Sequence, residues 1–257
     1  MAGHSQFKNI MYRKGAQDKK RARLFTKLAR EITVSAKEGG DDPDSNPRLR
    51  SAIAQARANN MPNNNIERAL KKATGEGASQ NYEEVRYEGY GPGGVAIVVD
   101  TLTDNRNRTA SEVRSAFSKL GGNLGETNSA SVMFERVGRV IFPETVADFD
   151  TVFEVAAEAG ADDVQHQPAN EDDDEPGSYE VICQANDFST VRDTLTERFG
   201  DPKEARLGWK PHSTQPVSEE QAQTLLKLLD TLEDYDDVQQ VTSNLELDDD
   251  VMQRLSA

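Results

Sequence analysis

The sequence predicts an α+β protein with an N-terminal three-helix bundle followed by two ferredoxin-like α+β domains, the middle domain being interrupted by the third. Two observations predict this class. Apolar residues recur at helical spacings over the first quarter of the chain, whereas beyond residue 80 short strand-like stretches alternate with helical ones. Charge divides the chain in the same place: residues 1–72 hold sixteen Lys and Arg against seven Asp and Glu, although the whole chain carries a formal net charge of −15.

The first predicted helix runs from Ala16 to about Lys37. Its apolar residues recur at spacings of one, three and four and therefore share one face. They are Leu24, Phe25, Leu28, Ile32 and Ala36. A second helix, ending near Asn60, begins where Asn46 caps the chain ahead of Pro47. A third begins at Pro62 and stops at Gly75, which predicts a small bundle.

The polar stretch after this bundle is typical of a linker, so we place a domain boundary near residue 80. Two strands are expected on either side of the turn Gly91-Pro92-Gly93-Gly94, and Asn105 caps a helix that runs to Leu120. The strand SVMFERV follows. The predicted domains are a basic helical domain (1–80), a discontinuous α+β middle domain (81–137 and 206–257) and an inserted α+β domain (138–205).

The inserted stretch has the pattern β-α-β-β-α-β, the split βαβ order of ferredoxin-like domains. Its segments are RVIF, FDTVFEVAAEAG, DDVQ, YEVICQ, FSTVRDTLTERFG and EARLGWKP. The final segment begins with a capping box at Ser218 and Gln221 and ends with the strand VQQVTSNL. Joined to residues 81–137, it is expected to complete the same order a second time.

Several functional classes are excluded by composition. The chain has no apolar run of about eighteen residues and no apolar leader, so we expect a cytoplasmic protein that does not contact membranes. The single cysteine, Cys183, excludes disulfides and lies in an apolar alternation typical of a buried, inert thiol. His4, His166 and His212 lack metal-ligand spacing, and the acidic run 171–175 lacks the spacing and glycine of a calcium loop. We expect no metal and no other cofactor.

Catalytic signatures are also missing. We find no nucleophile elbow, P-loop, His-Glu-x-x-His or dinucleotide-binding fingerprint in the sequence. The expectation is therefore a protein that is not an enzyme and has no small-molecule substrate.

The first thirty residues carry nine Lys and Arg and a single acid, Asp18, with Phe7 and Tyr12 interleaved. Point charges displace counterions from a phosphate backbone, and rings stack on exposed bases. The alternative is a solvated helix face, but such a face normally mixes charges of both signs. The predicted nucleic-acid-binding residues are Lys8, Arg13, Lys14, Lys19, Lys20, Arg21, Arg23, Lys27 and Arg30.

Arg106 and Arg108 form a candidate second anion contact, because they lie at a predicted helix N-terminus where free backbone N–H groups attract anions. The alternative there is helix capping with surface ion pairs. Arg48, Arg50 and Arg57 on the second helix carry a weaker signal for base readout, which almost any polar helix would give.

Long stretches of the sequence resemble a known family. They are GHSQFKNIMYRKGAQDKKRARLFTKLAREITVSAKEGG, NPRLRSAI, MPNNNIERALKKATGEG and YEGYGPGGVAIVVDTLTDNRNRTASEVRSAFSKLGGNLGETNSASVMF. The chain resembles the YebC/PmpR family of probable transcriptional regulators from Ala2 to about residue 142, and more loosely beyond. The resemblance implies three domains with the middle one interrupted, and a basic N-terminal segment that contacts nucleic acid. A mitochondrial relative is a translational activator of cytochrome oxidase subunit I, and bacterial members have also been assigned a role on the ribosome.

The expected function is that of a non-enzymatic regulator that binds DNA through its basic N-terminal domain and controls transcription. The alternative is a ribosome-associated translation factor, or translational activator, that binds RNA. Residues 73–257 hold fourteen Lys and Arg against thirty-eight Asp and Glu. These acidic domains repel phosphates, and their expected partners are basic proteins.

Overall fold

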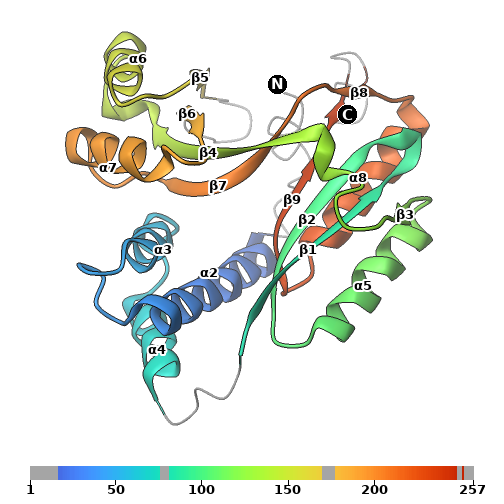
Figure 1. Ribbon diagram of the computed structural model, residues 1–257, viewed down its shortest axis with the longest axis horizontal. Coiled ribbons are helices and arrows are strands. Elements are labelled where there is room, and N and C mark those ends of the chain that lie inside the picture. The colour runs from blue at the N-terminus through green and yellow to red at the C-terminus, as the bar shows by residue number, and fades with distance from the viewer. Residues whose placement is uncertain (1–16, 76–80, 170–176, 248–250, 252–257) are drawn as a thin grey trace. The chain divides into compact units, whose positions relative to one another are not determined.

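The computed structural model describes residues 17–75, 81–169, 177–247 and 251 (Figure 1). The chain divides into two compact units. The first unit comprises residues 1–30, 76–135 and 211–257, and the second comprises residues 31–75 and 136–210. The three-domain boundaries expected from the sequence stay a prediction.

Three helices occupy the N-terminal region where the sequence predicted them: α2 (Gln17–Gly39), α3 (Pro47–Ala58) and α4 (Asn63–Thr74). The Asn46 side chain accepts a hydrogen bond from the Leu49 N–H at 3.1 Å and so caps α3. In the second unit Thr33 Oγ1 donates to the Ala69 carbonyl at 3.1 Å, which links α2 to α4. Each of the two shorter helices buries an apolar stripe: Leu49, Ala52, Ile53 and Ala56 on α3, and Ile66, Ala69 and Ala73 on α4.

The first unit contains a four-stranded sheet in the order β3-β1-β2-β9. Its strands are β1 (Glu83–Tyr90), β2 (Ala96–Thr103), β3 (Asn123–Leu124) and β9 (Val238–Ser243). Strands β1 and β2 pair as an antiparallel hairpin through the short 3-10 turn Pro92–Gly94, which confirms the predicted turn. Gly93 has a φ of 75°, a left-handed conformation that favours glycine. The short strands β8 (Gln215–Pro216) and β10 (Leu245–Glu246) form a separate parallel pair.

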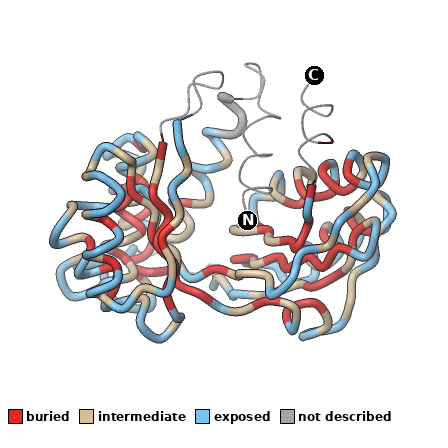
Figure 2. The backbone as a smooth tube through the Cα atoms, turned by 90° about the horizontal axis from the view of Figure 1, so that it is seen from above, coloured by how far each residue is buried: buried red, intermediate tan, exposed pale blue. Residues whose placement is uncertain are grey.

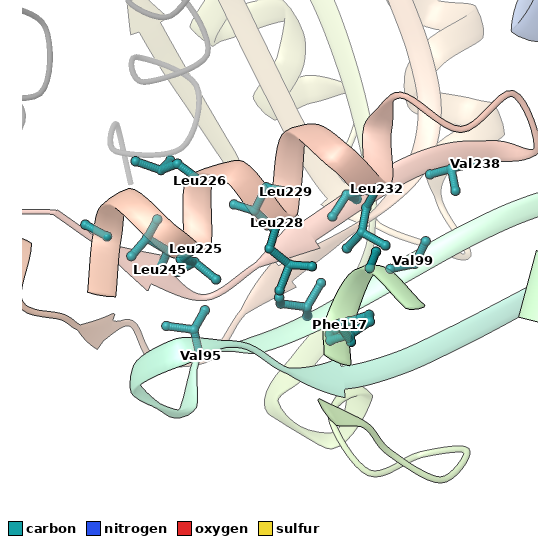
Figure 3. Close-up of a cluster of buried hydrophobic side chains, with 14 of the residues drawn as sticks. Val95, Val99, Phe117, Leu225, Leu226, Leu228, Leu229, Leu232, Val238 and Leu245 are labelled. Atoms are coloured by element: carbon teal, nitrogen blue, oxygen red, sulfur yellow. The ribbon is translucent and has the colours of Figure 1, made fainter. Parts of the chain in front are cut away.

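Two helices cover one face of this sheet, α5 (Arg106–Lys119) and α8 (Glu219–Glu233) (Figure 1). The predicted capping box of α8, Ser218 with Gln221, is present. Figure 3 shows the leucines of α8 packed over the sheet beside Phe117. Burying a leucine contributes about 1.5–3 kcal/mol, so this row is a major part of the core. Gly89 on β1 is required here, because a Cβ atom would lie 2.7 Å from the Phe117 ring.

The second unit contains the other four-stranded sheet, in the order β5-β6-β4-β7. Its elements are β4 (Phe134–Pro143), α6 (Phe149–Glu158), β5 (Asp163–Gln167), β6 (Ser178–Gln184), α7 (Phe188–Phe199) and β7 (Glu204–Pro211). This is the predicted β-α-β-β-α-β order. Buried stretches, red in Figure 2, follow central strands such as β2 and β6. Cys183 is buried as predicted, and burial raises the pKa of its thiol to about 11.

Two details differ from the sequence-based expectations, within a fold class that is confirmed. The separate strands predicted in SVMFERV and RVIF are a 3-10 turn (Ser131–Met133) and a single strand, β4. Gly138 does not break β4, because it pairs with Cys183 in the ladder with β6. The four-stranded sheet of the first unit and its two helices have the order β-β-α-β-α-β instead of the split βαβ order, since β1 and β2 pair directly before α5 begins.

Among the described residues, we find no helix that combines the length and the apolar character needed to cross a membrane.

The buried carboxylate of Glu88 ties the segment before β4 to the sheet of the first unit. Its Oε2 accepts hydrogen bonds from the Ala130 N–H at 2.9 Å and the Ser131 N–H at 2.7 Å, and Arg86 Nε donates to Oε1 at 2.9 Å. Burial raises the pKa of Glu88. The hydrogen bonds from Ser131 and Ala130 lower the pKa by more than burial raises it, so the net pKa lies below its ordinary value. Glu88 is therefore an ionised structural acceptor at neutral pH.

We expect Glu88→Gln to lower the free energy of unfolding by about 1–3 kcal/mol, because an amide oxygen replaces a carboxylate that accepts two backbone N–H groups and an ion pair. Urea unfolding at pH 7 measures the change. Glu83→Gln is the matched control at an exposed position of the same strand, with an expected effect below about 0.5 kcal/mol. Equal effects of the two substitutions would contradict the assigned role of Glu88.

Candidate nucleic-acid interface

The structure describes only part of the predicted N-terminal contact set. Lys8, Arg13 and Lys14 lie outside the described residues. Lys19 and Lys20 lie in the first turn of α2. The guanidinium of Arg21 is exposed and lies 5.3 Å from the centre of the Phe25 ring.

The remaining three predicted contacts lie along one face of α2 and bind the chain itself. Arg23 pairs with Asp234, and Lys27 Nζ donates to the Glu233 carbonyl at 2.8 Å. Arg30 Nη1 lies within hydrogen-bond distance of the carbonyl oxygens of Leu102 (2.9 Å) and Asp236 (2.7 Å) and of Asp237 Oδ1 (2.8 Å). As nucleic-acid contacts these residues stay a prediction. In this structure they hold α2 against the acidic segment 233–237 of the first unit.

Asp237 is the centre of this arrangement. Its side chain is 4% exposed, and Oδ2 accepts from Arg108 Nη2 at 2.6 Å, from Thr109 Oγ1 at 2.6 Å and from Thr103 Oγ1 at 3.1 Å. Burial raises the pKa of Asp237. The hydrogen bonds from Arg108 and Thr109 and the charge of Arg30 lower the pKa by more than burial raises it, so the net pKa lies below its ordinary value. The buried acid is therefore ionised and bound by two guanidinium groups.

At Arg106 and Arg108, the candidate second anion contact, the structure has a helix cap and ion pairs within the chain. Asn105 Oδ1 accepts from the Arg108 N–H at 3.1 Å, which caps α5. The Arg108 guanidinium also binds Asp104 at 2.8 Å, and its hydrogen bonds to Asp237 and Asp104 raise its pKa above the ordinary value. Arg106 is exposed, and its backbone carbonyl accepts from the Tyr87 hydroxyl at 3.2 Å. Arg108 thus has protein acceptors where an external anion would bind.

Helices α3 and α4 carry an exposed cationic set that the predicted contact set omitted. Residues 47–75 hold six Lys and Arg against one acid, Glu67. Arg48 binds Glu31 and Glu38 in the second unit, at 2.7 and 2.8 Å. The other five cations are exposed: Arg50, Arg57, Arg68, Lys71 and Lys72.

The spacing of these exposed cations places them on common faces. On α3 the two arginines are seven residues apart, and on α4 the three cations are separated by three and four residues. Arg50 Nη1 donates to the carbonyls of Pro43 and Asp44 at 3.2 and 3.3 Å. The signal was present in the sequence, since the arginines of α3 lie beside the apolar stripe of that helix and the cations of α4 lie opposite the stripe of theirs.

The described part of the chain provides no group of three or more His, Cys, Asp and Glu side chains arranged to hold a metal ion. The acidic run 171–175 lies outside the described residues. His166 Nε2 lies 3.1 Å from Glu144 Oε2. Both buried carboxylates with a shifted pKa, Glu88 and Asp237, are shifted downward, which is opposite to the shift expected for a general acid at neutral pH.

Asp237→Asn is expected to destabilise the protein by about 3–5 kcal/mol at pH 7, because it removes a buried charge bound by two guanidinium groups. The lowered pKa of Asp237 gives stability that is present above the unfolded pKa of about 4 and is lost as pH falls through the folded pKa. The variant should therefore lose less stability on acidification than the parent. Urea unfolding between neutral and acidic pH measures both effects.

Asp236→Asn is the matched control for this substitution, because the Asp236 side chain is exposed and only its carbonyl binds Arg30. We expect an effect below about 0.5 kcal/mol and an unchanged dependence on pH. If the two variants unfolded at the same urea concentration, Asp237 would not have the central role assigned to it.

Comparisons with known proteins agree along nearly the whole chain. Residues 5–76 match the family model for the TACO1/YebC protein N-terminal domain, and residues 82–245 match the model for the TACO1/YebC second and third domain. The chain is also similar to the crystal structure of a conserved hypothetical protein from Aquifex aeolicus. The two are 44% identical with a TM-score of 0.81, over 93% of this chain and 96% of the other. The chain described here belongs to the TACO1/YebC family.

Proposed function

We propose that this protein is a non-enzymatic regulator that binds DNA through its basic N-terminal helices. The observation that carries the proposal is the exposed cationic set of α3 and α4, where five cations face solvent against the single acid Glu67. Membership of a family described as transcriptional regulator-like supports the regulatory part of the proposal.

Phosphate binding depends on cations that can exchange water for a phosphate oxygen at low cost. Arg57, Arg68 and Lys71 are exposed, so a phosphate oxygen can replace water at each of them, with release of counterions from the DNA. Arg30 is in the opposite situation, because binding phosphate would require it to leave three acceptors and uncover the Asp237 charge. The proposed contacts are therefore the exposed cations of α3 and α4, together with those of the first 21 residues.

The acidic remainder of the chain restricts which surface a nucleic acid can approach. Residues 73–257 carry thirty-eight acids against fourteen Lys and Arg, so a polyanion is repelled there. Phosphate contact is then restricted to the cationic helices, which favours one orientation on the nucleic acid.

The second candidate function is that of a ribosome-associated translation factor that binds RNA. It is favoured by the resemblance of the N-terminal motifs to a mitochondrial translational activator. The same cations bind RNA phosphates equally well, so the two functions differ in the target and share the contact surface.

The triple variant Arg57→Gln, Arg68→Gln, Lys71→Gln tests the contact surface. With about six phosphate contacts on duplex DNA, log affinity should fall with log salt at a slope near −5, and the variant should make this slope shallower by about 0.9 for each phosphate that it no longer neutralises. Fluorescence anisotropy with the full chain and a labelled duplex measures the slope.

The matched control is Arg114→Gln, Lys119→Gln, Lys227→Gln, which removes the same charge from exposed positions on α5 and α8. It should leave the slope unchanged. Equal changes of slope in the two triple variants would show that net charge, and not this surface, governs binding. Co-sedimentation of the full chain with ribosomes at physiological salt, together with loss of duplex binding to excess unrelated DNA, would favour the translation function.

A further inference from the structure

One long stretch of the chain is free of cations. Between residues 140 and 191 there is no Lys or Arg, whereas the stretch holds fourteen Asp and Glu. Solvated surfaces normally mix charges of both signs. The described part of this stretch includes α6, β5 and β6 of the second unit, and it also holds two of the exposed large apolar side chains, Phe149 and Phe153.

The spacing of the exposed residues places two neighbouring rows of side chains on helix α6. Phe149 and Phe153 are four residues apart and share one face, where they are 37% and 51% exposed. Asp150, Glu154 and Glu158 follow each other at the same spacing, one residue further along the helix, and all three are exposed. An aromatic row therefore lies beside an acidic row on the same short helix.

The two phenylalanines belong to a fixed cluster of rings, which we name the aromatic patch: Phe149, Phe153, His166 and Tyr179. The Phe149 ring centre lies 6.0 Å from those of Phe153 and Tyr179, and the His166 and Tyr179 centres are 5.0 Å apart. Tyr179 is buried at the base of the patch. His166 is held from its other side by Glu144 at 3.1 Å. Rings fixed in this way lose little conformational freedom when a ligand covers them.

The chemistry of the occupant follows from the two rows together. A polyanion is repelled by the acidic row, and a purely apolar segment would leave those carboxylates without partners. A guanidinium group satisfies both rows, because its plane stacks on an aromatic ring while its N–H groups bind a carboxylate. Arginine is also enriched in protein interfaces. Lysine matches the charge but not the planar geometry.

We propose that the aromatic patch and the acidic row of α6 form a docking surface for an arginine-rich segment of a partner protein. Phe153, the most exposed ring, receives a guanidinium plane, and Asp150 and Glu154 bind its N–H groups. This surface is separate in sequence and in charge from the cationic set of α3 and α4. Docking here does not depend on nucleic-acid binding by the chain.

The test uses the full chain and a labelled ten-residue peptide of alternating Arg and Gly, with a matched Lys and Gly peptide. We expect the Arg peptide to bind more tightly than the Lys peptide in fluorescence anisotropy. Phe153→Ala should weaken Arg-peptide binding by about tenfold, the scale of a desolvated cation–π contact. The double variant Asp150→Asn, Glu154→Gln should weaken it by a similar factor.

Two controls separate the surface from general charge and apolar effects. Val132→Ala removes a side chain that is 68% exposed, and Glu197→Gln, Glu220→Gln neutralises two exposed acids elsewhere. Neither should change Arg-peptide binding, and circular dichroism confirms that every variant is folded.

Four results would overturn the proposal. They are equal binding of the Arg and Lys peptides, equal weakening in the patch variants and the controls, binding of labelled single-stranded RNA, measured without peptide, that Phe153→Ala abolishes, and self-association of the chain that Phe153→Ala abolishes. The last result would show that a second copy of the chain is the occupant. Since peptide binding is measured without nucleic acid, failure here leaves the DNA-binding proposal standing, and the reverse also holds.

Discussion

The buried charge of Asp237 is the constraint on which the arrangement of the first unit depends. A carboxylate removed from water is stable only when its charge and its lone pairs are satisfied, and here Arg30, Arg108, Thr103 and Thr109 do so together. These donors come from α2, from the end of β2 and from the first turn of α5. One carboxylate thereby binds donors from α2, from the β1–β2 hairpin and from α5 within this unit. Movement of any one of these elements removes a donor from the buried carboxylate.

Because of this buried acid, a run of cations in the sequence does not by itself identify a nucleic-acid contact. The basic face of α2 has the charge of a nucleic-acid contact. Two of its residues nevertheless form ion pairs with acids of the same chain, and a third donates a hydrogen bond to a backbone carbonyl. Counting charges along a sequence cannot separate cations that serve the fold from cations that are free to bind a ligand. The contacts in the folded chain make the distinction: Arg30 binds Asp237 and two backbone carbonyls with its side chain 12% exposed, whereas Arg57, Arg68 and Lys71 are exposed.

The parts of the fold that could be predicted from the sequence are those specified by contacts between residues three or four positions apart. Asn46 and Asn105 cap their helices through such contacts, and the apolar stripes of α3 and α4 have the same range. The pairing of Arg30 with Asp237 joins residues more than two hundred positions apart, and no local pattern encodes it. Gly138 illustrates the same limit. It resembles a break between strands, but a Cβ atom there would lie 2.7 Å from Cys183 Sγ and from the Phe188 ring, so glycine is needed for packing inside one continuous strand.

The two proposed surfaces differ in how strongly salt should weaken ligand binding, because one is composed of charges alone and the other of charges and aromatic rings. The exposed cations of α3 and α4 act through charge alone, so their hold on a polyanion weakens steeply as salt screens it. The proposed docking surface combines acidic charge with aromatic rings that a bound segment would cover. Salt does not screen the apolar part of the binding free energy. The two proposals together predict that rising ionic strength releases nucleic acid before it releases an arginine-rich protein. A chain with both surfaces is suited to a target in which nucleic acid and basic protein occur together, because each component meets the surface of opposite charge and is repelled by the other.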